Sequence, residues 1–88
     1  MPSLTLFPNP LKMATPLHLR WQHIIPGNYV VEVCTMDGAV IQSHNISVGK
    51  TNDETIMELS EIVAGNYFLR LLNTKSKKQL VQQLLIQE

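Results

Sequence analysis

Apolar and polar residues alternate along most of the chain, and clusters of Pro, Gly, Asn and Asp interrupt the alternation at short intervals. A period of two places successive side chains on opposite faces of a strand, and Pro, Gly, Asn and Asp favour the turns between strands. The pattern therefore predicts short strands and few helices. The expected strands are residues 4–7, 17–21, 29–35, 40–48, 55–59, 66–73 and 78–87.

Two of these segments also predict which face is buried, and a third predicts the position of its strand in the sheet. Alternation in 17–21 puts Leu17, Leu19 and Trp21 on the buried face, with His18 and Arg20 outside. In 66–73 the expected inner residues are Tyr67, Leu69 and Leu71. In 29–35 both faces are mostly apolar, with Tyr29, Val31 and Val33 on one and Val30, Glu32 and Cys34 on the other. Two apolar faces favour an interior position in the sheet for this strand.

The expected connections between strands contain residues that favour turns. Pro8-Asn9-Pro10 ends the first strand, because proline fixes φ and removes a ladder donor. Asp37-Gly38 predicts a tight hairpin with a primed turn, since glycine adopts positive φ without a steric cost. Residues 60–64 are expected to form a tight corner or a single helical turn, and residues 74–77 a basic polar turn.

Seven short strands at this spacing are typical of an all-β fold, and we expect a seven-stranded antiparallel immunoglobulin-like β-sandwich. One domain should span residues 1–88, because so short a chain buries one modest core. An amphipathic helix is the alternative for the segment from Leu80 to Ile86. Leu80 and Leu84 are four residues apart, and Gln82-Gln83 interrupts the apolar alternation of a strand.

The composition argues against several classes of function for this chain. Seven basic and seven acidic residues balance, which argues against binding to nucleic acid. No apolar run approaches the roughly 20 residues that cross a bilayer, so membrane insertion is not expected. Met1-Pro2-Ser3 lacks the features of a signal peptide, and we expect the chain to be a fragment of a longer precursor.

The residue types that carry chemistry are scattered. Cys34 is interpreted as a small buried hydrophobe. His18, His23 and His44 do not form the local pairs typical of zinc sites, and no serine has an elbow motif around it. No glycine-rich phosphate loop occurs either. We therefore expect no enzyme activity, metal or cofactor.

Three ordered landmarks resemble those of the C-terminal sorting domains of the type IX secretion pathway, in their type A form. The first is Leu6-Phe7-Pro8-Asn9-Pro10, and the second is Tyr29 to Val33 followed by Met36-Asp37-Gly38 and Val40-Ile41. The third runs from Leu59-Ser60 to Ala64-Gly65-Asn66-Tyr67 and on to Leu71. A closing run from Lys77-Lys78 to Leu84-Leu85-Ile86 is similar to the family's lysines and alternating apolar ending. The resemblance covers nearly the whole chain.

The resemblance implies a sorting function without catalysis. The chain would be a fragment of a larger exported precursor, and the folded domain would pass through the periplasm and be bound by the type IX machinery, which moves its cargo across the outer membrane to the cell surface or the medium. A sortase-like protease would then remove the domain.

The landmark residues of this interpretation are Pro8, Asn9, Pro10, Asp37, Gly38, Ala64, Gly65 and Tyr67. Tyr67 is expected to be a core aromatic residue whose hydroxyl reaches a backbone partner. The surface expected to be recognised comprises Lys75, Lys77 and Lys78 with Val81, Leu84, Leu85 and Ile86 of the terminal strand. Unpaired strand edges could also support self-association.

The alternative function is an immunoglobulin-like binding or spacer module, for example for a polysaccharide, because such folds carry many functions. That alternative requires an exposed aromatic platform. Among the five aromatic residues, Phe68 is the one expected outside.

Overall fold

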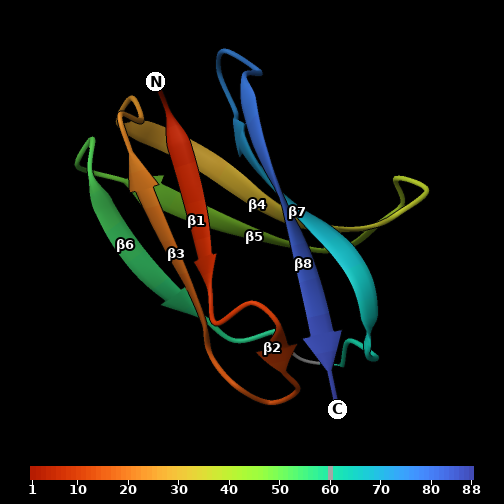
Figure 1. Ribbon diagram of the computed structural model, residues 1–88. Helices are drawn as coiled ribbons and strands as arrows, with labels where there is room; N and C mark the ends of the chain where they lie inside the picture. The colour runs from red at the N-terminus through yellow and green to blue at the C-terminus, as the bar shows by residue number, and fades with distance from the viewer. Residues whose placement is uncertain (60) are drawn as a thin grey trace.

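Strands form where the sequence alternates, and the computed structural model contains eight of them in residues 1–59 and 61–88, the part of the chain that it describes (Figure 1). They are β1 (Ser3–Phe7), β2 (Leu11–Lys12), β3 (Leu17–Gln22), β4 (Gly27–Thr35), β5 (Val40–Val48), β6 (Asp53–Met57), β7 (Gly65–Asn73) and β8 (Gln79–Gln87). The described residues contain no helix, and hence none long and apolar enough to cross a membrane.

Two sheets share these strands. The first has the order β1-β3-β6, with antiparallel pairs throughout. The second has the order β2-β8-β7-β4-β5. Strand β4 lies between β7 and β5, as the two apolar faces of its sequence predicted. The N-terminus lies at the same end of the molecule as the turn between β7 and β8, and the C-terminus lies at the opposite end (Figure 1).

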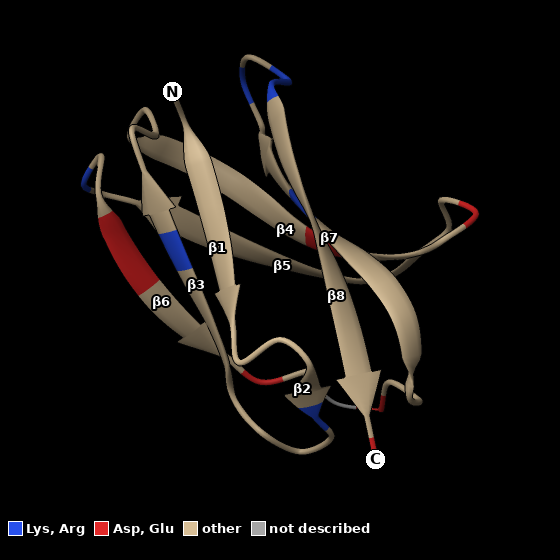
Figure 2. Cartoon of the chain, viewed as in Figure 1, with Lys and Arg blue, Asp and Glu red and all other residues tan. Residues whose placement is uncertain are grey.

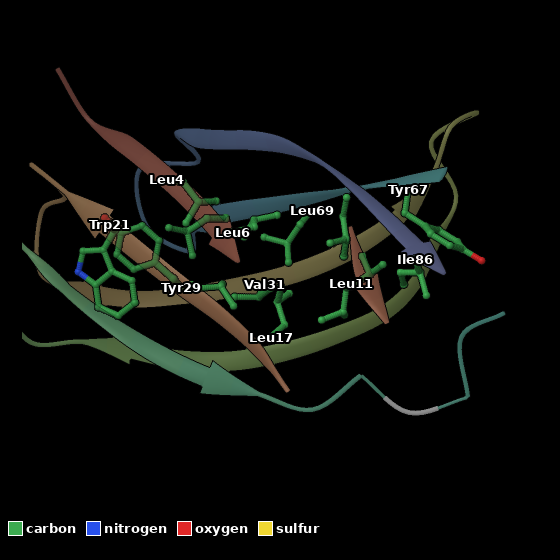
Figure 3. Packing of buried hydrophobic residues seen from close by; sticks show 14 of the residues in the cluster. Leu4, Leu6, Leu11, Leu17, Trp21, Tyr29, Val31, Tyr67, Leu69 and Ile86 are labelled. Carbon is green, nitrogen blue, oxygen red and sulfur yellow. The ribbon is translucent and has the colours of Figure 1, made fainter. Parts of the chain in front are cut away.

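One hydrophobic core collects the inner faces of both sheets (Figure 3). It contains the predicted inner residues of β3 and β7 and one of the two apolar faces of β4, each residue with at most 7% of its surface exposed: Leu17, Leu19, Trp21, Tyr67, Leu69, Leu71, Tyr29, Val31 and Val33. The loops add Ile24 and Ile62, which are also buried. Each buried leucine stabilises the fold by roughly 1.5–3 kcal/mol relative to an exposed one. Cys34 is fully buried as well, and burial raises the pKa of its thiol.

The expectation of seven antiparallel strands is wrong in two respects, since the described residues form eight strands and one pair is parallel. Strand β2 contains only Leu11 and Lys12 and pairs in parallel with Ile86 and Gln87 of β8. The chain leaves the first sheet after Phe7 and joins the edge of the second sheet at Leu11. Two residues directly after a proline carry no detectable alternation, and so the pattern could not predict this strand.

Two further expectations need correction, and the structure decides between the two alternatives of a third. The fifth expected strand lies two residues earlier, at Asp53–Met57, because its pairing with β3 runs from Asp53 to Met57. The helical alternative for the last segment is wrong, since β8 pairs with β7 from Gln79 to Ile86. For residues 60–64 a tight corner or a helical turn was expected; residue 60 lies outside the described residues, and residues 61–64 form a corner without a helical turn.

The hairpin between β4 and β5 forms where Asp37-Gly38 predicted it, but with a different turn. The Gly38 amide donates to the Thr35 carbonyl at 3.0 Å, and Gly38 has φ of +96°. Positive φ therefore occurs at the last residue of the turn rather than at both central residues, as a primed turn requires. A separate irregularity follows in the ladder, where Cys34 pairs with Val40 and Val33 with Gln42, so that Ile41 of β5 is the extra residue.

Candidate functional site

Asn9 of the Pro-Asn-Pro segment covers part of the edge of β8. Its side-chain nitrogen donates to the Gln83 carbonyl at 2.8 Å, and its side-chain oxygen accepts from the Leu85 amide at 3.1 Å. An asparagine amide thus replaces a strand residue, because it offers one donor and one acceptor to the ladder. Both prolines follow cis peptide bonds. Asn9 therefore provides hydrogen-bond partners for backbone groups of β8 at a sheet edge that would otherwise be open.

Strand β2 continues the same cover toward the C-terminus. Its two residues pair with Ile86 and Gln87, and the Met13 amide donates to the Gln87 carbonyl at 2.7 Å. Leu11 anchors the segment in the core with 2% of its surface exposed. The edge of β8 is therefore occupied from Gln83 to Gln87, the C-terminal half of the strand.

The third landmark forms a corner. The Tyr67 hydroxyl donates to the Val63 carbonyl at 2.6 Å, and the ring is buried with 7% exposure. This confirms the prediction of a core aromatic residue with a backbone partner. Ala64 is exposed just before the strand begins at Gly65. The hydrogen bond ties the start of β7 to the loop that precedes it, as tyrosine corners do in immunoglobulin-like folds.

A second corner of the same design precedes β4. The Tyr29 hydroxyl donates to the Ile25 carbonyl at 2.6 Å, and the ring is 6% exposed. We call residues 24–29 the Tyr29 corner and residues 62–67 the Tyr67 corner. Both contain Gly-Asn-Tyr preceded by a buried isoleucine, a repeat that is visible in the sequence but was not noticed there. A comparison of the chain with itself would have found it.

The turn between β7 and β8 carries the three predicted lysines in a fixed geometry. The Asn73 side-chain oxygen accepts from the amides of Lys75 and Ser76, each at 2.9 Å. The Lys77 amide donates to the Asn73 carbonyl at 3.0 Å, and the Asn73 amide donates to the Lys78 carbonyl at 2.9 Å. All three lysines are exposed, and Figure 2 shows positive charge without negative charge at this turn.

The structure separates the other predicted recognition residues into two groups. Leu84 and Ile86 belong to the core, with 0% and 3% exposure, so they cannot contact a partner of the folded domain. Val81 is 48% exposed, and Leu85 is half-buried. The accessible part of the predicted surface is therefore the lysine turn with Val81 and, to a lesser extent, Leu85.

A cavity lies at each end of the molecule, and the charged side chains that line the two cavities have opposite signs. A cavity of 460 Å³ adjoins the Tyr29 corner, and Lys77 and Lys78 are among its lining residues. A cavity of 340 Å³ adjoins the Tyr67 corner, and its charged lining residues are Glu58 and Glu61.

Candidate catalytic and metal-binding residues do not converge in the described part of the chain. There, no three His, Cys, Asp or Glu residues are grouped as a metal site requires. The Nδ1 atom of His18 lies 3.6 Å from a carboxylate oxygen of Glu54, and its ring stacks on Phe7 with ring centroids 4.8 Å apart. Arg20 completes this surface cluster with an ion pair to Glu54 at 3.1 Å.

The aromatic residues give little support to the alternative of a polysaccharide module. All five lie in the described residues, and none is exposed: Trp21, Tyr29 and Tyr67 are buried, and Phe7 and Phe68 are half-buried. The expectation that Phe68 lies outside is met only in part.

Comparison with known proteins agrees with these landmarks. A model of the family described as secretion system C-terminal sorting domain matches residues 5–87. Among solved structures, a chain of PorZ is similar with a TM-score of 0.67 and 14% identity; it is described as an essential surface component of the type IX secretion system of Porphyromonas gingivalis. The match covers 98% of the present chain and 12% of the PorZ chain, and at this identity it shows a shared fold. No curated protein matches the chain.

The family match spans almost every residue and includes all three landmarks. The chain therefore belongs to the family of C-terminal sorting domains of the type IX secretion pathway, which direct proteins to the cell surface or the extracellular space.

Proposed function

We propose that the folded domain is itself the sorting signal and that outer-membrane components of the type IX machinery bind it through the hairpin of β7 and β8. The observation that carries this proposal is the lysine turn. Lys75, Lys77 and Lys78 are exposed, and the Asn73 hydrogen bonds hold the turn in one conformation. A preformed turn loses little conformational entropy on binding, which favours recognition.

The domain acts as a binding module in this proposal and not as an enzyme. A cargo joined ahead of β1 would pass through the periplasm, and a sortase-like protease would remove the domain at the cell surface. The similarity to PorZ, a surface component of the same pathway, supports an immunoglobulin-like sandwich as the shared scaffold. Balanced charge supports an interaction with proteins rather than with nucleic acid.

Self-association, if it occurs, would use β5 rather than β8. Strand β5 is the outer strand of the second sheet, and its nine residues contain no Lys, Arg, Asp, Glu or Pro. Natural edge strands usually carry such residues to prevent pairing with another chain. The edge of β8, in contrast, is covered by Asn9 and β2 toward its C-terminal end.

Fusion of residues 1–88 to an exported reporter tests the recognition surface. The variant Lys75→Gln/Lys78→Gln should reduce display of the reporter on the cell surface several-fold. The control Lys12→Gln/Lys50→Gln removes the same charge elsewhere and should leave display unchanged. Equal display of both variants would refute the proposal for this turn. Deletion from Leu84 onward is less informative than substitution, because it also removes core residues.

A further inference from the structure

The cavity beside the Tyr29 corner combines an apolar wall with cations. Its buried or half-buried apolar lining residues are Ile24, Tyr29, Leu71 and Leu80. Its volume of 460 Å³ lies within the roughly 300–1,000 Å³ range of sites that bind small ligands or anchoring side chains. Lys77 and Lys78 contribute positive charge, and none of its lining residues is acidic. The cavity therefore suits an apolar group that carries negative charge beside it.

Within the described part of the chain, the lysines at this cavity have no carboxylate partner. The ion pairs found among residues 1–59 and 61–88 join Glu54 to His18 and Arg20, and Glu32 to Arg70. None of them involves the lysines of the β7–β8 turn. An exposed ammonium group that is not already paired can interact with an incoming carboxylate without first breaking another contact.

We propose that this cavity binds an extended acidic peptide segment of the secretion machinery. Carboxylates of the segment lie against Lys77 and Lys78, and one apolar side chain enters the cavity beside Leu71 and Leu80. Ser76 and Gln79 line the same cavity and provide donors and acceptors for a peptide backbone, which a lipid chain would leave unused. Ile25 extends the apolar surface at the rim, with 68% exposure. This inference rests on the proposed function and names the chemistry of the partner.

A binding measurement with synthetic peptides tests the proposal directly. Fluorescence anisotropy of a labelled Gly-Asp-Leu-Asp-Gly peptide is followed while the 88-residue chain is added. Replacement of both Asp by Asn, or of Leu by Ser, should weaken binding about tenfold or more, which corresponds to about 1.4 kcal/mol. Added salt should weaken binding as well, because the contacts are exposed charges. Equal binding of all three peptides would overturn the proposal.

Variants of the domain locate the site. Lys77→Gln/Lys78→Gln should weaken binding of the acidic peptide about tenfold or more. Lys12→Gln/Lys50→Gln carries the same charge change away from the cavity and should bind within about twofold of the parent chain. Circular dichroism of each variant checks that the fold is retained. Equal weakening by both double variants would show a nonspecific charge effect and would overturn the assignment of the site.

Two other occupants give distinct results that would also overturn the proposal. Binding to phosphatidylglycerol vesicles without binding to the peptide would assign the cavity to an anionic lipid surface. Self-association in analytical ultracentrifugation that Lys77→Gln/Lys78→Gln abolishes would assign it to the acidic end of a second copy. The reporter assay separates this inference from the proposed function. If Lys77→Gln/Lys78→Gln lost peptide binding but the reporter were still exported normally, the cavity would bind acidic peptides, and the surface that sorting requires would lie outside the lysine turn.

Discussion

At Tyr29 and at Tyr67 the chain enters a strand of the second sheet in the same way. In both corners a buried isoleucine is followed, after two residues, by Gly-Asn-Tyr, and the tyrosine hydroxyl donates to a carbonyl four residues earlier at 2.6 Å. The two rings lie at opposite ends of the core (Figure 3). Strands β4 and β7 that follow are antiparallel neighbours, so the corners face opposite ends of the molecule.

The surroundings of the two corners differ in charge. The Tyr29 corner adjoins the lysine turn, since Tyr29 pairs with Asn73 and the Thr74 amide donates to the Asn28 carbonyl. The Tyr67 corner adjoins the turn of Asp37, because Tyr67 pairs with Thr35. Its cavity is lined by Glu58 and Glu61. Gly-Asn-Tyr thus builds a corner at both places where it occurs in this chain, and the two corners differ in the charge of the side chains around them.

The ion pair of Glu32 and Arg70 lies midway between the corners. These residues are directly opposite each other in the pairing of β4 and β7, and their side chains approach to 2.7 Å. Each occupies the same position in its repeat, three residues after the corner tyrosine. The two repeats therefore meet at this pair, in which one repeat supplies the acid and the other supplies the base.

Removal of either corner ring should have the largest effect on stability. Tyr29→Ala and Tyr67→Ala should each lower the free energy of unfolding by about 3–5 kcal/mol, the usual cost of truncating a buried aromatic residue. Urea denaturation measures both values on the same scale. Because the rings are equally buried, we expect losses within about 1 kcal/mol of each other. A much smaller loss at one corner would show that the two are not equivalent in energy.

The sequence predicted the parts of the fold that follow from local periodicity. The buried faces of β3 and β7 were predicted correctly, because alternation between apolar and polar side chains indicates which face is buried, and the two apolar faces of β4 predicted its interior position. The register of β6 and the short strand β2 were missed, since both depend on pairing with strands distant in the chain. Tertiary contacts, rather than local preference, determine such elements.

In the candidate site as well, local features were predicted from the sequence and features that depend on distant contacts were not. Exposure of the lysine turn followed from its composition. The role of Asn9 did not, because its partners Gln83 and Leu85 lie at the other end of the chain. The burial of Leu84 and Ile86 agrees with the alternation in the last strand, although both had been assigned to a recognition surface. Alternation indicates the core side of a strand, and core residues are poor candidates for direct contact with a partner.

The next largest effect is expected at the ion pair between the two repeats. Glu32→Ala leaves the partly buried Arg70 guanidinium without its acceptor and should cost about 1–3 kcal/mol in unfolding free energy. The double variant Glu32→Leu/Arg70→Met should recover most of this loss, because a packed apolar pair often replaces a buried ion pair without penalty. Urea denaturation of the three chains provides the comparison. A double variant as unstable as Glu32→Ala would mean that the pair itself, rather than the unpaired charge, matters.

A smaller effect separates the corner hydrogen bonds from the packing of the rings. Tyr29→Phe and Tyr67→Phe retain the ring and remove only the hydroxyl, so each should lower the free energy of unfolding by about 0.5–1.5 kcal/mol. Hydrogen exchange at the start of β4 and of β7 should then accelerate at the mutated corner alone. Faster exchange at both corners from either substitution would show that the two ends are coupled through the sheet.

The smallest effect concerns the acidic turn beside the Tyr67 corner. The Thr35 hydroxyl donates to the Asp37 carboxylate, and this hydrogen bond lowers the pKa of that carboxyl below its ordinary value. A lowered pKa in the folded state means that ionised Asp37 stabilises the fold above the pKa of the unfolded chain, and that this contribution disappears as the pH falls through the folded value. Melting temperatures between pH 6 and pH 2 should therefore fall slightly less for Asp37→Asn than for the parent chain, with the difference confined to values below about pH 4. Lys75→Gln, in the corresponding basic turn, provides the control, because an exposed lysine does not titrate in this range. If the parent chain and Asp37→Asn had parallel profiles throughout, the hydrogen bond to Thr35 would contribute nothing measurable, and the two turns would differ in charge alone.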